Sequence, residues 1–488
     1  MNKLLPIIIA AIVSGCALGP DYQHPDYEAP QSSHPENFYA ASAKQRDQTA
    51  TRSASQAFWQ GFQDPVLAGL IQNTLTDNYD LQAMLARYRG AEALLRHTRR
   101  EQWPSVTVSA GASHQQLAEV ERPRPEIDEL DLYEAGAALA WEIDLFGRLA
   151  RATQAQQALF EASGADVQAL QVALTGQLAN SYFELRGLQE QLLVTQHNVA
   201  FQQSSLDIVS SRLKAGRGNQ FDLFRARAQL NTTRAAIPEL QAGIRTNMHR
   251  IAVLTGKPPG TLIDVLAVAT GLPETVPLIP VGTPGEVLRR RPDIRAAERR
   301  VAAASAAIGV ATADLFPRFT LQGLAGTLAT SGGDMFTSGA ESHRIVFGID
   351  WSFLDRALVR ARIDAADADA EAALADYRQT VLLALEETET WLVRYQQAQA
   401  RVALLSDAEQ AADQAVSQAR ERYEQGYIGY FELLTAELEL NHARDSLVKS
   451  QTDQALAMVS VYRSLAGAPA SGDQKTFEPV ALSGFGGT

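Results

Sequence analysis

The chain has 488 residues, a formal net charge of -13 and hydrophobic residues at 46% of its positions. This acidic balance argues against a nucleic-acid binder, which usually presents a basic face. No segment after residue 16 is long and apolar enough to predict a transmembrane helix.

The N-terminus carries the features of an exported protein. Lys3 precedes an apolar run over residues 4–13, and small residues then lead to Cys16, the single cysteine of the chain. This pattern predicts a signal peptide over residues 1–15. Cys16 could be a spare thiol or a partner in an intermolecular bond. Its position resembles a bacterial lipobox, however, which implies lipidation of Cys16 and an anchor in the outer membrane. Residues 16–63 are then expected to form a lipidated, extended arm.

The rest of the chain repeats itself. Residues 78–81 with their helical run are matched by residues 291–294 with theirs, and Trp141 is matched by Trp351. A repeat unit this long indicates a duplicated half-protein rather than a stacked array. The predicted organisation is a first repeat over 64–256, a linker or equatorial segment over 257–285, a second repeat over 286–467 and a C-terminal tail over 468–488.

Each repeat contains a segment in which apolar residues alternate with polar or small ones. The alternation covers residues 133–143 in the first repeat and 345–353 in the second. Period two predicts β-strands, so we expect β-hairpins over about 103–144 and about 317–353. Strands with one apolar face and polar loops are typical of a transmembrane β-barrel, and a soluble sandwich with a buried face is the alternative.

Long helical tracts occupy residues 150–256 and 355–467, and their composition is typical of coiled-coil-like helices. Each tract breaks once near its middle, at Gly216 and at Gly426, where glycine allows the chain to reverse. Each helical arm is then expected to measure roughly 50 to 90 Å.

Four amphipathic strands cannot close a barrel, and an open sheet edge is not tolerated in lipid. Three copies with four strands each would give twelve strands. The predicted fold is a mixed α and β membrane protein. It is an internally duplicated homotrimer with a 12-stranded β-barrel that continues into a long periplasmic α-helical coiled-coil barrel.

Several segments resemble the hallmarks of the outer membrane factors, the TolC-like channels of tripartite efflux pumps. They are residues 16–22, 141–148, 290–300 and 314–317, together with the two glycine turns. The resemblance spans essentially the whole chain. It is closest to the lipoprotein branch that serves resistance-nodulation-division pumps.

This resemblance implies a homotrimer in the bacterial outer membrane that extends into the periplasm. It also implies a periplasmic adaptor (membrane fusion protein) and an inner-membrane pump as partners. The trimer would be a passive conduit that exports drugs or other small molecules. A type I-like protein secretion channel and a non-conducting, lipid-tethered periplasmic scaffold are the alternatives. The resemblance further places the turns at Gly216 and Gly426 at the periplasmic tips, where Arg217 and Tyr427 would contact the adaptor.

The family commonly places acidic residues and a bulky apolar constriction at this entrance, and Asp222, Phe431 and Glu432 occupy matching positions. Carboxylates repeated in three copies would form a negative ring that favours cations. Alternatively, Asp222 and Glu432 only cap or solvate helix starts. Some relatives carry an aspartate where this chain has Thr435, so the residue that sets the constriction is left open.

Four aromatic residues fall where strands meet helices, and they are expected to form an interfacial girdle or to pack the joint between barrel and helices. They are Trp103, Trp141, Trp351 and Phe353. Motifs for catalysis, phosphate binding or metal binding are missing from the sequence, so neither a catalytic residue nor a metal or other cofactor is expected, and the chain is not predicted to be an enzyme.

Overall fold

The computed structural model describes residues 18–25, 58–59, 61–121, 129–273 and 284–465. The predicted signal peptide, Cys16 and the C-terminal tail lie outside these residues. The chain divides into two compact units. Unit 1 comprises residues 1–27, 86–165 and 295–380, unit 2 comprises residues 28–85, 166–294 and 381–488, and each is described by itself.

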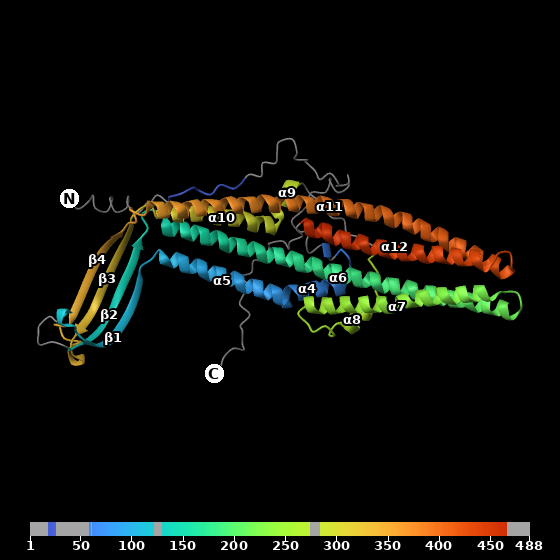
Figure 1. The fold of residues 1–488 in the computed structure, drawn as a ribbon, viewed down its shortest axis with the longest axis horizontal. Coiled ribbons are helices and arrows are strands. Elements are labelled where there is room, and N and C mark those ends of the chain that lie inside the picture. The colour runs from blue at the N-terminus through green and yellow to red at the C-terminus, as the bar shows by residue number, and fades with distance from the viewer. Residues whose placement is uncertain (1–17, 26–57, 60, 122–128, 274–283, 466–488) are drawn as a thin grey trace, which may run out of the picture. The chain divides into compact units, whose positions relative to one another are not determined.

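Unit 1 contains one antiparallel sheet of four strands (Figure 1). Its strands are β1 (Ser105–Gln116), β2 (Glu129–Ile143), β3 (Arg318–Ala329) and β4 (Glu341–Asp350), in the order β1-β2-β3-β4. The first two form the hairpin of one repeat and the last two form the hairpin of the other. The repeats join where β2 pairs with β3, with Trp141 opposite Leu321. The two alternating segments of the sequence are therefore parts of a single sheet.

In the single chain, the apolar face of this sheet is exposed to solvent. Val106 pairs with Leu139 on β2, and their row continues through Gly323 on β3 to Ile345 on β4. Val108 is 80% exposed and Ile345 is 79% exposed. A soluble sandwich would bury such a face within the chain. The face is instead available to a membrane or to another molecule.

Helices make up most of the remaining described residues. They are α4 (Pro65–Asp77), α5 (Tyr79–Glu101), α6 (Arg148–Lys214), α7 (Gln220–Leu254), α8 (Ile263–Ala267), α9 (Pro284–Arg290), α10 (Pro292–Ala313), α11 (Arg356–Gln425) and α12 (Tyr430–Ser464). Short 3₁₀ turns, η1 (Glu119–Glu121) and η2 (Gly332–Asp334), lie between the strands of the two hairpins. Within the described residues, none of the helices combines the length and the apolar character needed to cross a membrane.

The long helices differ in length from the prediction. The helices α6 and α11 have 67 and 70 residues, whereas α7 and α12 have 35 each. At 1.5 Å per residue, α11 is about 105 Å long, which exceeds the predicted range. The prediction was wrong because each glycine turn lies about two-thirds of the way along its tract rather than at the middle.

The helices begin at residues that favour a helix start. Asp64 caps α4, and its Oδ1 accepts hydrogen bonds from the amides of Val66 at 2.9 Å and Leu67 at 3.0 Å. Asn78 accepts from the amide of Leu81 in α5 at 3.0 Å. Such side chains satisfy amides that lack a partner within the helix. The helix α10 begins at Pro292, whose missing N–H costs nothing at a first helical position.

An aromatic cluster forms part of the core of unit 2. Phe58 stacks on Tyr462 of α12 with ring centroids 4.2 Å apart, and Phe62 lies 5.2 Å from Phe183 of α6. All four rings are buried. Large buried aromatic side chains dominate core energetics, so the segment before α4 is fixed against α6 and α12.

Candidate functional site: the helix tips

The two glycine turns have the same backbone geometry. Gly216 has φ +70° and Gly426 has φ +82°, the left-handed region in which glycine is favoured. The Gly216 amide donates to a carbonyl three residues earlier at 3.0 Å, and the Arg217 amide donates to one five residues earlier at 2.9 Å. Gly426 and Tyr427 repeat both bonds at 3.0 and 2.9 Å. These bonds satisfy the last carbonyls of α6 and α11 as in a Schellman motif.

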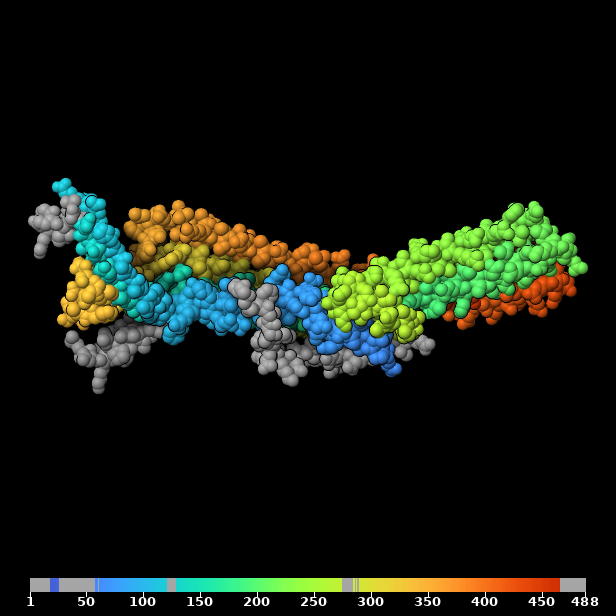
Figure 2. Space-filling view, turned by 90° about the horizontal axis from the view of Figure 1, so that it is seen from below, coloured from blue at the N-terminus to red at the C-terminus, as the bar shows by residue number. Residues whose placement is uncertain are grey.

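An arginine joins the ends of the two long helices. Arg212 at the end of α6 donates hydrogen bonds to the carbonyl oxygens of Tyr423 and, at 3.2 Å, of Glu424 at the end of α11. Its guanidinium also lies 4.2 Å from the centroid of the Tyr423 ring. The ends of α6 and α7 therefore lie against those of α11 and α12 (Figures 1 and 2). This contact was missed from the sequence, because nothing local in a helical tract indicates which arginine faces the other repeat.

Both predicted gate carboxylates lie in the first turn of a helix. Asp222 is half-buried, and its amide donates to the capping side chain of Asn219 at 2.8 Å. Glu432 is exposed in the first turn of α12. A Cβ added at Gly429 would lie only 3.0 Å from Oε2 of Glu432, so this carboxylate turns back over the helix start. A helix start stabilises negative charge, and this geometry therefore accommodates both a capping and a gating role.

Phe431 and Thr435 lie beside these carboxylates. The ring of Phe431 is 57% exposed and lies 5.0 Å from the guanidinium of Arg225 on α7. Arg225 also lies 5.5 Å from the ring of Phe221, so one cation sits between aromatic rings of α7 and α12. Thr435 donates its hydroxyl to the Phe431 carbonyl at 2.8 Å. Arg225 was not predicted from the sequence, although aromatic residues next to a glycine turn are a hint.

The predicted girdle residues lie in unit 1, at the ends of the strands. Trp141 donates its indole N–H to the carbonyl of Gln102 at 3.1 Å, and Trp351 donates to Leu315 at 3.0 Å. The two repeats therefore make equivalent hydrogen bonds from matching tryptophans. The Trp103 side chain is exposed. Phe353 is exposed and lies 5.3 Å from the Trp351 ring. The hydrogen bonds support the joint, and the exposed rings remain available to an interface.

In unit 1, Arg151 of α6 and Gly309 of α10 hold residues 18–22, and we call this set of contacts the arm clasp. The buried side chain of Arg151 on α6 donates to the carbonyl oxygens of Leu18 at 2.9 Å and Gly19 at 3.3 Å and to the Asp21 carboxylate at 2.7 Å. A Cβ at Gly19 would lie 2.5 Å from the Cα of Gly309, so α10 and the arm need glycine at both positions. The sequence did not predict this long-range contact.

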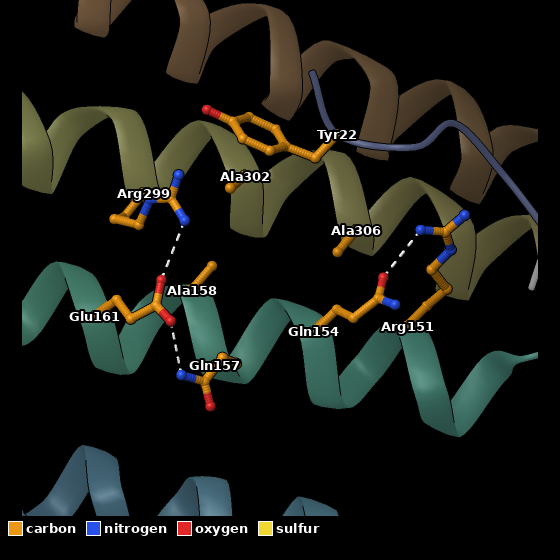
Figure 3. A pocket seen from close by; sticks show the side chains of 9 residues that line it. All are labelled: Tyr22, Arg151, Gln154, Gln157, Ala158, Glu161, Arg299, Ala302 and Ala306. Atoms are coloured by element: carbon orange, nitrogen blue, oxygen red, sulfur yellow. Dashed lines mark hydrogen bonds and ion pairs between the residues drawn. The ribbon is translucent and has the colours of Figure 1, made fainter. Parts of the chain in front are cut away.

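Tyr22 closes a small cavity beside the arm clasp (Figure 3). The cavity has a volume of about 230 Å³. The hydroxyl of Tyr22 donates to Glu298, and Arg299 pairs with both Glu298 and, at 3.1 Å, Glu161. Burial raises the pKa of Tyr22, and the hydrogen bond to Glu298 adds to this. The phenol therefore stays neutral, and this cluster links the arm to α6 and α10.

Comparison with known proteins shows relatives along nearly the whole chain. A family model described as outer membrane efflux protein matches residues 70–257 and 283–467. Nodulation protein T of Rhizobium leguminosarum bv. trifolii is 29% identical over 97% of each chain. A toluene efflux pump outer membrane protein of Pseudomonas putida is 28% identical over 95% of this chain and 98% of its own.

Solved structures show the same fold. The outer-membrane channel OprN is 38% identical, with a TM-score of 0.86, and the match covers 93% of this chain and 100% of that chain. The Campylobacter jejuni CmeC outer membrane channel has a TM-score of 0.84 at 21% identity over 94% of this chain and 96% of its own. The predicted fold class and the resemblance to TolC-like channels are thereby confirmed.

Proposed function

The chain belongs to the outer membrane efflux protein family of the bacterial outer membrane, and from this membership we propose that it is the channel of a tripartite efflux system. Three copies form a twelve-stranded barrel that continues into a periplasmic helical tunnel. A periplasmic adaptor and an inner-membrane pump deliver drugs or other small molecules to it. The chain itself catalyses no reaction and holds no cofactor.

The observation that carries this proposal is the four-stranded sheet with an exposed apolar face. Within the described residues, β1 and β4 each pair with only one strand. An open edge in lipid leaves backbone groups unsatisfied, so the sheet must be continued by other copies. Twelve strands lie within the range of known membrane barrels.

The helix tips supply the entrance of this proposed tunnel. In three copies, Asp222 and Glu432 give a ring of carboxylates that favours cations over anions. Phe431 narrows the passage beside them, and Arg217 and Tyr427 are exposed next to the turns, where an adaptor docks. Capping is the alternative role of the two carboxylates, and it leaves the channel itself unaffected.

Lipidation of Cys16 anchors each copy, in keeping with the lipoprotein branch that serves resistance-nodulation-division pumps. The arm clasp begins at Leu18, two residues after this cysteine. It holds the start of the mature arm against α6 and α10. Small-molecule efflux is favoured over protein secretion because the relatives include solvent and toluene efflux pump proteins.

The test is export from cells of the source bacterium that lack the gene. We expect these cells to accumulate a fluorescent efflux dye several-fold more than the parent, and the intact gene to restore export. A variant with Cys16→Ser should restore less, because the anchor is lost. If the deletion strain exports the dye normally but lacks a protein that the parent releases into the culture supernatant, the secretion channel is favoured. If the deletion strain exports both the dye and its secreted proteins normally, and the purified trimer does not conduct, the scaffold is favoured.

A further inference from the structure

A buried acid lies close to the entrance, in α12. Glu437 is 1% exposed. Ser205 on α6, also 1% exposed, donates a hydrogen bond from its hydroxyl to Oε1 of Glu437 at 2.5 Å. Within the described part of the chain, the other carboxylate oxygen, Oε2, is buried without a hydrogen-bond partner. A buried carboxylate that lacks partners is costly in its ionised form. The side chain is therefore better suited to this site when it carries a proton.

Other polar groups around this position are also incompletely satisfied. Arg420 on α11 has two buried nitrogens, Nε and Nη2, without a partner among the described residues, while its guanidinium lies 3.9 Å from the ring of Phe201 on α6. The same holds for both side-chain amide atoms of Gln202 on α6 and for Nδ2 of Asn441 on α12. Native proteins satisfy most buried polar groups, so this concentration of buried polar atoms without a protein partner in the ranges that the structure describes sets the surroundings of Glu437 apart.

The titratable groups near Glu437 on the helices packed against it come from α11 and α12. Arg420 and Tyr423 lie on α11 and Tyr430 lies on α12, whereas α6 contributes uncharged Ser205. Burial raises the pKa of Glu437, and the Ser205 hydrogen bond and the charge of Arg420 lower it by less. Burial also raises the pKa of Tyr423 and of Tyr430, so neither phenol titrates near neutral pH.

The remaining helix, α7, brings a charge of each sign. Asp222 and Arg225 both act on Tyr430, with opposite effects on its pKa. Tyr430 belongs to an apolar cluster at the helix tips, where it packs with Val209 of α6 and Leu433 of α12. Glu437 follows Leu433 of this cluster by about one helical turn in α12.

We propose that Glu437 is a proton switch for the entrance: the neutral carboxyl keeps α12 packed on α6 and α11, and its ionisation loosens the packing between these helices. The inference rests on the proposed function, since it assigns a regulator to the same entrance. A raised pKa in the packed state means that the stabilisation is complete below pH 4.5, the ordinary value of this carboxyl. It is lost as the pH rises towards the packed-state pKa. Acid therefore closes the tip, and alkali opens it.

The experiment is hydrogen–deuterium exchange on the purified full-length trimer between pH 5 and pH 8, corrected for the intrinsic pH dependence of exchange. In peptides covering residues 200–212 and 430–441, we expect exchange to rise with pH by up to about tenfold per pH unit within the titration window. Glu437→Gln, which keeps the shape but cannot ionise, should stay protected at every pH. Glu439→Gln, at an exposed position of the same helix, should behave as wild type.

A second variant keeps the proposal testable if Glu437→Gln does not assemble. The Ser205 hydrogen bond favours the charged form, so Ser205→Ala should move the exchange midpoint to higher pH. The proposal is overturned by wild-type exchange without pH dependence, by pH dependence that persists in Glu437→Gln, or by an unchanged midpoint in Ser205→Ala. Exchange does not require conduction, so a protein that switches but carries no current would contradict the channel and leave the switch intact.

Discussion

Arg151→Ala is expected to release the arm clasp without unfolding unit 1. The wild-type guanidinium donates to the carbonyls of Leu18 and Gly19 and to the Asp21 carboxylate. A hydrogen bond from a charged donor contributes about 1.5 to 3 kcal/mol. The bond to Gly19 is long at 3.3 Å, and Asp21 is 90% exposed, so its ion pair adds at most about 1 kcal/mol. We expect a loss of about 3 kcal/mol, or about a hundredfold in the docking equilibrium.

The assay is hydrogen–deuterium exchange of the peptide that contains residues 18–25. The Leu18 amide donates to the Phe146 carbonyl at 3.3 Å, so its exchange reports docking directly. Gly309→Ala should also raise exchange of this peptide, because its Cβ would lie 2.8 Å from both the Leu18 oxygen and Cγ of Arg151. Arg87→Ala, at an exposed position of α5, is the control. Wild-type protection of the arm in Arg151→Ala would refute this reasoning.

Three further perturbations test the tips and the strand ends. Arg212→Gln should loosen the contact between α6 and α11 and raise exchange in both glycine turns, and unchanged exchange would show that the arginine contributes little. Gly426→Ala forces alanine into a left-handed conformation at a cost of about 1 to 2 kcal/mol and should lower the melting temperature, whereas Gly260→Ala, in open space, should not. Trp141→Phe and Trp351→Phe each remove one matched hydrogen bond worth about 1 kcal/mol, so calorimetry should show similar losses in the two variants, and markedly unequal losses would argue against equivalent joints.

The sequence predicted the features that depend on local pattern. The alternation around Trp141 and Trp351 predicted strands, and those strands are present in one sheet. Gly216 and Gly426 predicted chain reversals, because a left-handed turn requires glycine for geometric reasons alone. Repeated motifs then indicated that each feature would occur twice, down to the tryptophan hydrogen bonds.

Contacts between distant segments were not predictable in this way. Arg151, Arg212 and Glu437 lie in long helical tracts with many other charged residues. Which of them meets a partner depends on how each helix is rotated and which neighbour it packs against. The helix period gives only a face of one helix and not its partner. The burial of Glu437 depends on the packing of α6 and α11 against α12, which the sequence of α12 alone does not specify.

Single-channel conductance of the purified trimer in planar bilayers tests directly whether the protein is a conduit with an acidic entrance. We expect a cation-selective conductance in the wild type that rises or loses selectivity in Asp222→Ala/Glu432→Ala. The control, Glu439→Ala, should retain the wild-type selectivity. Selectivity and conductance unchanged in the double variant would return both carboxylates to helix capping. Absence of conductance from a verified trimer, in the wild type and in the double variant alike, would show that the trimer is not an open-ended conduit.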